Sequence, residues 1–328
     1  MKNTTGGSTR FTRRGVVVLA LAVASGALAG CPRKAVRVMA PCPREVVSLE
    51  QLIAQHNQQA GMAPQLWSRI DRIDVTFLDD KGKSKSYTLT SGYLLLRKNP
   101  GDPFGPQDFL VTGREGNKDI FRLGSDATGG VYYFWYDVSR DQQGGRWGRY
   151  ANLNRPGMQT TGFNPTQLVN VLGLLPWPTR LEEPPFPTAV AEMDPCVYLM
   201  RFYATRPGRQ GFYLEREVTL DRRDPAHRPT LVRLYDSFGR NVMVATPRNY
   251  AAIGGASSAS AGPEVATEVD IIWPLVERSG LKAIRLRLQK RDLTTAKALP
   301  ESTFAFAPES LNIRDVQEID LPVTQAQK

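Results

Sequence analysis

Beyond residue 70, the chain repeatedly alternates apolar and polar residues with a period of two, the pattern of strands with one buried face. In 282–290, Ile284, Leu286 and Leu288 alternate with arginine and glutamine. Other strand candidates, separated by turns that contain Gly or Pro, lie at 70–77, 87–97, 109–111, 119–122, 131–136, 212–220, 230–236, 240–246 and 303–307. They predict a mainly β (α+β) protein with one antiparallel sheet of roughly nine or ten strands. A sheet of this size does not stay flat, so we expect it to curl.

Two helices are predicted to cover the inner face of this sheet. The first opens at a capping box that begins with Ser48 and stops near Gly61. The second has Asn164 as N-cap and Pro165 at its first position, and its apolar stripe extends to Leu175.

The N-terminus has the layout of a secretory signal. Residues 1–14 carry Lys2 and three arginines and no acid, and an apolar run at 16–24 follows. The apolar run is too short to cross a bilayer, which needs about 20 such residues. The pair Arg13-Arg14 resembles a twin-arginine export motif, but paired arginines also occur in ordinary signals, so the export route stays open.

The signal closes with Leu28-Ala29-Gly30-Cys31, which resembles the lipobox of bacterial lipoproteins. The resemblance implies that the Cys31 thiol takes a diacylglycerol, that the chain is cut before it, and that the new amine is acylated. It implies a protein tethered to a membrane of the bacterial envelope. Pro32, by resemblance to proteobacterial sorting rules, favours the outer membrane, on its periplasmic side, over the inner one.

The expected organisation has one folded domain. Residues 1–30 are the signal, 31–46 are the lipidated cysteine and its tether, and 321–328 are a tail. A single domain is expected at 47–320, with insertions near 176–195, which is rich in proline, and 254–266, which is rich in Gly, Ala and Ser.

The charges and the cysteines indicate an envelope protein without nucleic-acid contacts. The formal net charge is +10 and the basic residues are spread along the chain without a block. Besides Cys31, the chain has only Cys42 and Cys196, which form a disulfide candidate in an oxidising compartment. Two unpaired thiols are the alternative.

The order of the elements resembles the LolA/LolB-like lipoprotein carriers. The local segments that support this resemblance are 92–100, the helix at 165–175, the strands at 212–220 and 230–236, the turn at 236–240, and the closing Phe304-Ala305-Phe306-Ala307-Pro308. The resemblance implies an incomplete β-barrel covered by helices over an apolar cavity.

What the resemblance implies for function is a carrier that binds acyl chains of lipids or lipoproteins and does no chemistry. Each methylene kept from water contributes about 0.8 kcal/mol, and the helices would act as a lid. In the 212–220 strand, Phe212 and Leu214 are expected on the same face as Val218 and Leu220. The expected lining residues are Leu95, Phe109, Val111, Phe134, Leu172, Phe212, Leu214, Ile284 and Leu286; ordinary core packing is the alternative for each.

A second hypothesis is an envelope lipoprotein that holds a protein partner and carries no lipid. Its interface would use Trp135, Trp147, Tyr150 and Trp273, which could equally be core residues.

Catalytic and metal-binding patterns were not found, so we expect no enzyme, no cofactor and no metal site. Neither His56 nor His227, the 2 histidines, lies in an H-E-x-x-H motif, and no G-x-S-x-G or P-loop occurs. We interpret His56 as part of the first helix surface and His227 as a solvated residue of a hairpin loop.

Overall fold

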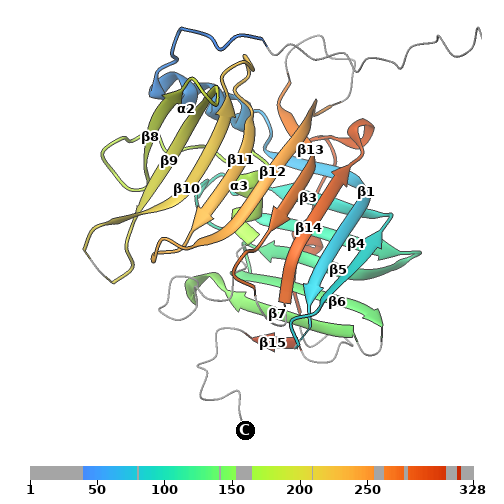
Figure 1. The fold of residues 1–328 in the computed structure, drawn as a ribbon. Coiled ribbons are helices and arrows are strands. Elements are labelled where there is room, and N and C mark those ends of the chain that lie inside the picture. Colours follow the sequence, from blue (N-terminus) through green and yellow to red (C-terminus); the bar gives the residue numbers. More distant parts are fainter. Residues whose placement is uncertain are drawn as a thin grey trace, which may run out of the picture. The chain divides into compact units, whose positions relative to one another are not determined.

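One sheet of 15 strands forms the frame of the unit Cys42–Lys328 in the computed structural model (Figure 1). The structure describes residues 40–79, 81–139, 142–152, 165–208, 210–254, 262–276, 280–307 and 316–318. The signal segment with Cys31, the expected N-cap Asn164, most of the 254–266 loop and the tail lie outside the described residues.

The strands follow each other mostly as antiparallel neighbours. Their order across the sheet is β15-β7-β6-β5-β4-β3-β1-β14-β13-β12-β11-β10-β9-β8, and β2 pairs with β1 beside this path. Their bounds are β1 Gln65–Leu78, β2 Ser84–Leu89, β3 Gly92–Arg97, β4 Asp108–Glu115, β5 Lys118–Asp126, β6 Val131–Ser139, β7 Gln142–Arg149, β8 Phe186–Glu192, β9 Val197–Thr205, β10 Phe212–Asp221, β11 Pro229–Tyr235, β12 Asn241–Ala252, β13 Glu264–Ile272, β14 Gly280–Leu288 and β15 Val316–Glu318.

The centre of the sheet is the long strand β1, which joins an N-terminal and a C-terminal run of strands. It pairs with β3 on one side and with β14 on the other, with Val75 opposite Ile284. The end strands β8 and β15 do not pair with each other, so the sheet is curved but open. The predicted fold class, a curved antiparallel sheet covered by helices, is confirmed, with β15 as one parallel addition beside β7.

The sheet has 15 strands where roughly nine or ten were expected, and β9 and β13 were missed although β9 alternates buried and half-buried residues. Other missed strands lack such alternation. β7 contains Gln-Gln-Gly-Gly and was not predicted, and β8 lies inside the expected proline-rich insertion. β8 tolerates Pro187 because it is an edge strand. The strand predicted at 303–307 is wrong: a 3-10 turn covers Glu301–Thr303, and Phe306 stacks on Tyr133 instead of joining the sheet.

Two helices in the described part of the chain, α2 (Leu49–Gly61) and α3 (Pro165–Val171), pack on the same face of the sheet, called here the inner face. The capping box of α2 is present: Gln51 N–H donates to Ser48 Oγ at 3.3 Å, and Ser48 N–H donates to Gln51 Oε1 at 3.2 Å.

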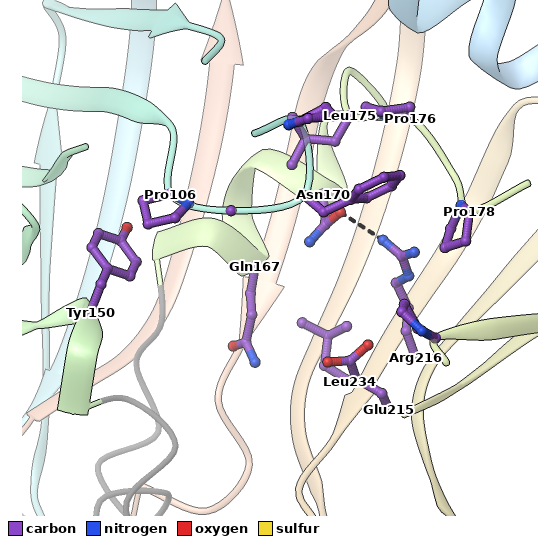
Figure 2. A pocket seen from close by; sticks show the side chains of 14 residues that line it. Pro106, Tyr150, Gln167, Asn170, Leu175, Pro176, Pro178, Glu215, Arg216 and Leu234 are labelled. Atoms are coloured by element: carbon purple, nitrogen blue, oxygen red, sulfur yellow. Dashed lines mark hydrogen bonds between the residues drawn. The ribbon is translucent and has the colours of Figure 1, made fainter. Parts of the chain in front are cut away.

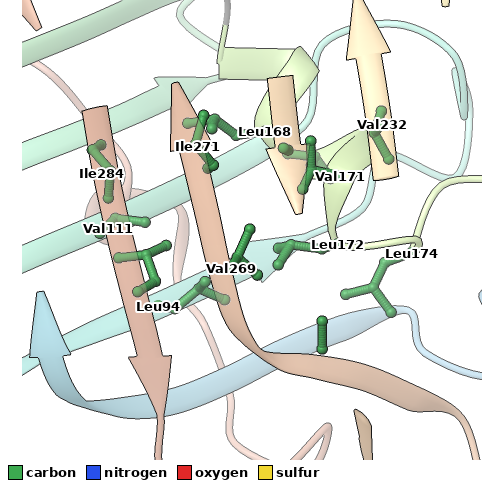
Figure 3. Packing of buried hydrophobic residues seen from close by; sticks show 14 of the residues in the cluster. Leu94, Val111, Leu168, Val171, Leu172, Leu174, Val232, Val269, Ile271 and Ile284 are labelled. Carbon is green, nitrogen blue, oxygen red and sulfur yellow. The ribbon is translucent and has the colours of Figure 1, made fainter. Parts of the chain in front are cut away.

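The short helix α3 depends on packing. It has 7 residues, too few to be stable alone. Leu168, Val169, Val171 and Leu172, at its end, are buried against the inner face (Figure 3). Each such side chain contributes about 1.5–3 kcal/mol when it is buried. Tertiary contacts therefore hold α3 in place.

A second cluster lies on the opposite, outer face of β3–β6. The segment after β14 crosses this face, and its Leu299 and Phe304 pack on Leu110, Tyr133 and Trp135. The sequence did not decide whether the tryptophans and Tyr150 belong to the core or to an interface. The structure buries Trp135 and Trp273 in the core, and leaves Trp147 and Tyr150 half-buried.

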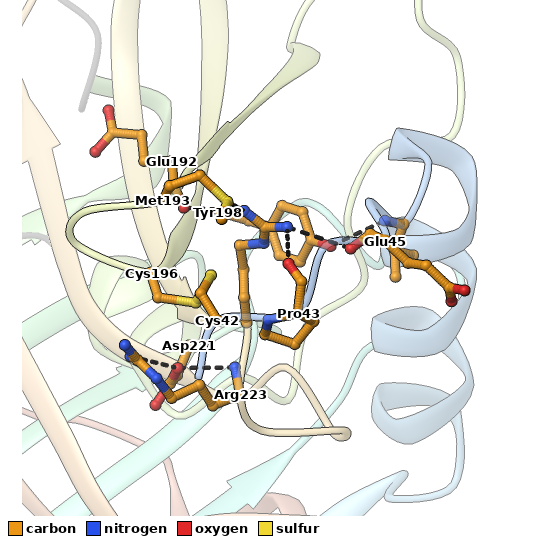
Figure 4. Close-up of a disulfide and its surroundings, with 11 residues drawn as sticks. Cys42, Pro43, Glu45, Glu192, Met193, Cys196, Tyr198, Asp221 and Arg223 are labelled. Carbon is orange, nitrogen blue, oxygen red and sulfur yellow. Dashed lines mark hydrogen bonds and ion pairs between the residues drawn. A yellow bond between two sulfur atoms is a disulfide. The ribbon is translucent and has the colours of Figure 1, made fainter. Parts of the chain in front are cut away.

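The segment that precedes α2 is bound to the sheet by a disulfide between Cys42 and Cys196 (Figure 4). The Arg222 guanidinium donates to the carbonyl oxygens of Pro43 and Glu45 at 2.7 and 3.2 Å. The Val47 N–H donates to the Tyr198 hydroxyl at 2.9 Å. A covalent bond and three hydrogen bonds therefore hold residues 42–47 against the sheet.

His56 does more than form the surface of α2. Its ring stacks on Trp177 with centroids 3.8 Å apart, and its Nε2 lies 2.9 Å from the Leu175 carbonyl oxygen. Burial lowers the pKa of His56 to about 4. The hydrogen bond to the Leu175 carbonyl raises this pKa, and the positive charges of Arg216 and Lys98 lower it further. His227 lies in the β10–β11 hairpin loop as expected, but it is half-buried instead of solvated: its Nδ1 lies 2.9 Å from Gln55 Oε1 and its ring packs on Tyr198.

We expect the free energy of unfolding to fall as the pH drops from about 6.5 toward about 4, by up to about 3 kcal/mol from His56 alone. The free energy of unfolding falls because, between these two pH values, the unfolded chain binds a proton at His56 and the folded chain does not. Urea titrations of the wild type and His56→Gln at several pH values measure this. An unchanged pH slope in the variant would contradict the assignment.

Candidate functional site

A pocket of about 510 Å³ opens where β10 and β11, α3 with the chain that follows it, and the β3–β4 loop meet (Figure 2). Its volume lies in the range of small-molecule sites, about 300–1,000 Å³. The described residues that line it are Pro103, Phe104, Gly105, Pro106, Tyr150, Gln167, Asn170, Leu175, Pro176, Pro178, Pro185, Glu215, Arg216 and Leu234. Segments more than 100 residues apart in the sequence therefore build one site.

A β-bulge in β10 brings two opposite charges to the pocket. Leu214 faces Tyr203 of β9 and Arg216 faces the next residue, Phe202, so Glu215 is an extra residue without a partner. A bulge of this kind redirects side chains and is frequent at functional sites. As a result, the neighbours Glu215 and Arg216 both line the pocket instead of pointing to opposite faces.

Arg216 is a buried cation with little hydrogen bonding. It is 8 % exposed, its guanidinium lies 4.1 Å from the centre of the Phe202 ring, and its Nη1 donates to Asn170 Oδ1 at 2.6 Å. Its Nε is buried without a hydrogen-bond partner. A guanidinium has five N–H donors, so this one keeps donors that the described residues do not use.

Glu215 is the matching anion. In the described part of the chain, it forms no hydrogen bond and no ion pair. Burial raises the pKa of Glu215, and the charge of Arg216 opposes this; burial likewise lowers the pKa of Arg216 against the charge of Glu215. Each charge therefore stabilises the other without a direct hydrogen bond or ion pair, which is costly for the buried Arg216 and less so for the half-buried Glu215.

The remaining wall is mainly apolar. Proline rings contribute much of it, together with Leu175 and Leu234, and prolines carry no N–H that would need a partner. At the rim, Phe104 is 57 % exposed. The pocket thus combines a charged end with hydrocarbon surface.

The nine residues expected to line a cavity do not line this pocket. Six of them belong to the packed core on the inner face, and Leu95 belongs to the outer cluster, because β3 has three successive leucines that alternate between the faces. Those six are Phe109, Val111, Phe134, Leu172, Ile284 and Leu286.

The expected face of Phe212 and Leu214 is wrong. The bulge at Glu215 shifts the alternation by one residue, so that these two side chains lie on the face opposite Val218 and Leu220. Phe212 is 52 % exposed and packs edge-on against Phe186 at 5.1 Å.

Sequence reading missed Arg216, although a signal was available. Arg216 occupies the row of Val218 and Leu220, in which an apolar residue is expected. Charged side chains are rarely buried, so a charge in this row indicates a special environment. Here that environment is the pocket. Gln167 and Asn170 of α3 carried no such signal.

Other features of the described residues define no further site. A smaller cavity of about 50 Å³ lies beside α2, between His56 and Tyr250. Within the described ranges, no group of three or more His, Cys, Asp or Glu side chains is placed to hold a metal. In the same ranges, no helix is long and apolar enough to cross a membrane.

The fold and the pocket define a class of protein: an open, curved antiparallel sheet covered by helices, with an amphipathic pocket on its inner side. No family model matches the chain, and no curated protein matches it. Solved structures do match.

The chain is similar to a domain from Vibrio parahaemolyticus described as an outer membrane lipoprotein-sorting protein, at 14 % identity and TM-score 0.42, over 77 % of this chain and 95 % of that one. It is similar to a DUF1329 family protein from Desulfovibrio piger, at 10 % identity and TM-score 0.44, over 78 % and 95 %. A LolA superfamily protein from Nitrosomonas europaea matches at 11 % identity and TM-score 0.40, over 80 % and 99 %. The LolA-like fold expected from the sequence is thus represented among its structural neighbours.

Proposed function

We propose that this protein is a bacterial envelope lipoprotein, anchored through Cys31, that binds the acyl-bearing part of a lipid or lipoprotein for carriage or insertion. The observation that carries the proposal is the pocket beside β10, with a charged end and a proline-rich apolar wall. An amphiphile has the same two parts. Hydrocarbon placed on the apolar wall leaves water, at about 25 cal/mol per Å² of apolar area.

The core beneath the pocket is filled with side chains, which bears on how the ligand would be held. The inner-face residues and the buried side of α3 form a packed core, and the pocket of about 510 Å³ lies beside it. The ligand would therefore place its head and the first part of its chains in the pocket, with the rest along the rim at Phe104.

Filling the pocket is expected to weaken ligand binding strongly. In Gln167→Trp, an indole replaces a side chain that lines the pocket from α3, and we expect lipid occupancy to fall at least about tenfold. Native mass spectrometry of the intact protein, released from detergent, measures the occupancy as added mass. Gln58→Trp, on the exposed side of α2, is the matched control and should bind like the wild type.

The outcome that contradicts the proposal is an intact, folded wild type that carries no lipid and takes up none. In that case the second function, a lipoprotein that holds a protein partner, gains support. It has one observation in its favour: on the edge strand β8 and the residue after it, Val190 and Met193 are 44 % and 58 % exposed. An exposed edge strand with apolar side chains is a surface that another chain can pair with.

A further inference from the structure

We propose that the pocket selects a zwitterionic phospholipid head of the phosphoethanolamine class, with Arg216 binding the phosphate and Glu215 binding the ammonium. This rests on the proposed function and names the head group that the same pocket would recognise. It follows from the bulge in β10, which places two opposite, unpaired charges side by side at one end of the pocket.

The charge balance of the pocket argues against a simple anion. Apart from Tyr150, Glu215 and Arg216 are the only ionisable groups among the described residues that line it. A monoanion would gain from Arg216 and be repelled by Glu215. A ligand with both signs on neighbouring atoms pairs with both residues and compensates the buried charge of Arg216 and the half-buried charge of Glu215.

The free donors and acceptors fit the two halves of this head group. Arg216 uses Nη1 for Asn170 and has further N–H groups, and a guanidinium matches phosphate oxygens well. The Glu215 carboxylate accepts hydrogen bonds, and a primary ammonium has three to donate, whereas a trimethylammonium has none. Ethanolamine heads should therefore be preferred over choline heads.

The apolar surroundings indicate that the zwitterion belongs to a lipid and not to a small free solute. The lining of the same pocket includes five prolines and Phe104, which is 57 % exposed. A free phosphoethanolamine would leave this wall in contact with water. A glycerolipid covers it with its glycerol and upper acyl carbons.

The test offers the intact detergent-solubilised protein an equimolar mixture of phosphatidylethanolamine, phosphatidylcholine and phosphatidylglycerol with matched acyl chains, and native mass spectrometry counts each bound lipid. We expect the ethanolamine lipid to exceed each of the others about tenfold. A second arm adds free O-phosphoethanolamine, which should compete weakly or not at all. Strong competition by the free solute would overturn the assignment to a lipid.

Four variants, one of them a control, separate the roles of the charges. Arg216→Gln should lower ethanolamine-lipid occupancy about tenfold, and Glu215→Gln should remove the preference over the glycerol lipid while binding persists. Arg233→Gln is the control: Arg233 lies on the neighbouring strand and pairs with Glu217 at 2.9 Å, outside the pocket. Thermal unfolding of each variant checks that it is folded, and Arg216→Lys, which keeps the charge, should retain part of the binding.

The possible failures are distinguishable. Lipid binding without a head-group preference, or the same preference in Glu215→Gln and Arg216→Gln as in the wild type, overturns this inference and leaves the proposed function intact. No binding of any of the three lipids overturns both.

Discussion

Replacing Cys31 by serine is expected to move the protein completely from the membrane fraction to the soluble fraction. In the proposed lipoprotein, the Cys31 thiol forms the thioether that holds the diacylglycerol; a serine hydroxyl does not form it, so the anchor would be lost. Several acyl chains, at about 0.8 kcal/mol per buried methylene, make membrane attachment effectively permanent, and nothing comparable replaces them. Cell fractionation shows the distribution, and the mass of the intact protein shows the lipid.

The control is the double variant Cys42→Ser/Cys196→Ser, which removes the two other cysteines together but leaves the lipobox unchanged. It should remain in the membrane fraction with the full lipid mass. If Cys31→Ser stayed membrane-bound, or if the wild type lacked the added mass, the protein would not be a lipoprotein of this kind.

The second large effect concerns the disulfide. The double variant Cys42→Ser/Cys196→Ser should lose about 5 kcal/mol of unfolding free energy, because the bond closes a loop of 154 residues and restricts the unfolded chain. Replacing both cysteines avoids a lone thiol. Urea unfolding of the double variant and of the wild type, with and without reductant, measures the difference.

Loss of the disulfide should also loosen the segment at residues 42–47. Without the bond, residues 42–47 are held by hydrogen bonds to Arg222 and Tyr198 and by the packing of Val47, so their amide protons should exchange faster while the inner core keeps its protection. Reductant should destabilise the wild type and leave the double variant unchanged. Equal stability of the two proteins under oxidising conditions would show that the bond is absent in solution.

Elements with a regular local pattern were predictable. The alternation in 282–290 correctly placed Ile284 and Leu286 on the inner face, and the Ser48 capping box correctly marked the start of α2. These signals depend on residues two to four positions apart. Strands without the signal, such as the Gly-containing β7, are held by their neighbours, and no local rule reveals them.

The candidate site was much less predictable than the fold. Six expected lining residues are ordinary core, and two others lie on the face opposite the inner core because of one bulge. Arg216 stood in an apolar row and was the one pocket residue with a local signal. The other parts of the pocket come from loops and from α3, whose positions depend on distant packing.

The sequence by itself determined which side of regularly alternating strands such as 282–290 is apolar, and with it a large antiparallel sheet that has to curve, because side-chain direction repeats every two residues along a strand. Only the tertiary structure decided where that repeat is broken and which loops meet. The extra residue Glu215 is defined by its pairing with β9, and the pocket by segments from residue 103 to residue 234. These are long-range contacts, and no short stretch of sequence specifies them.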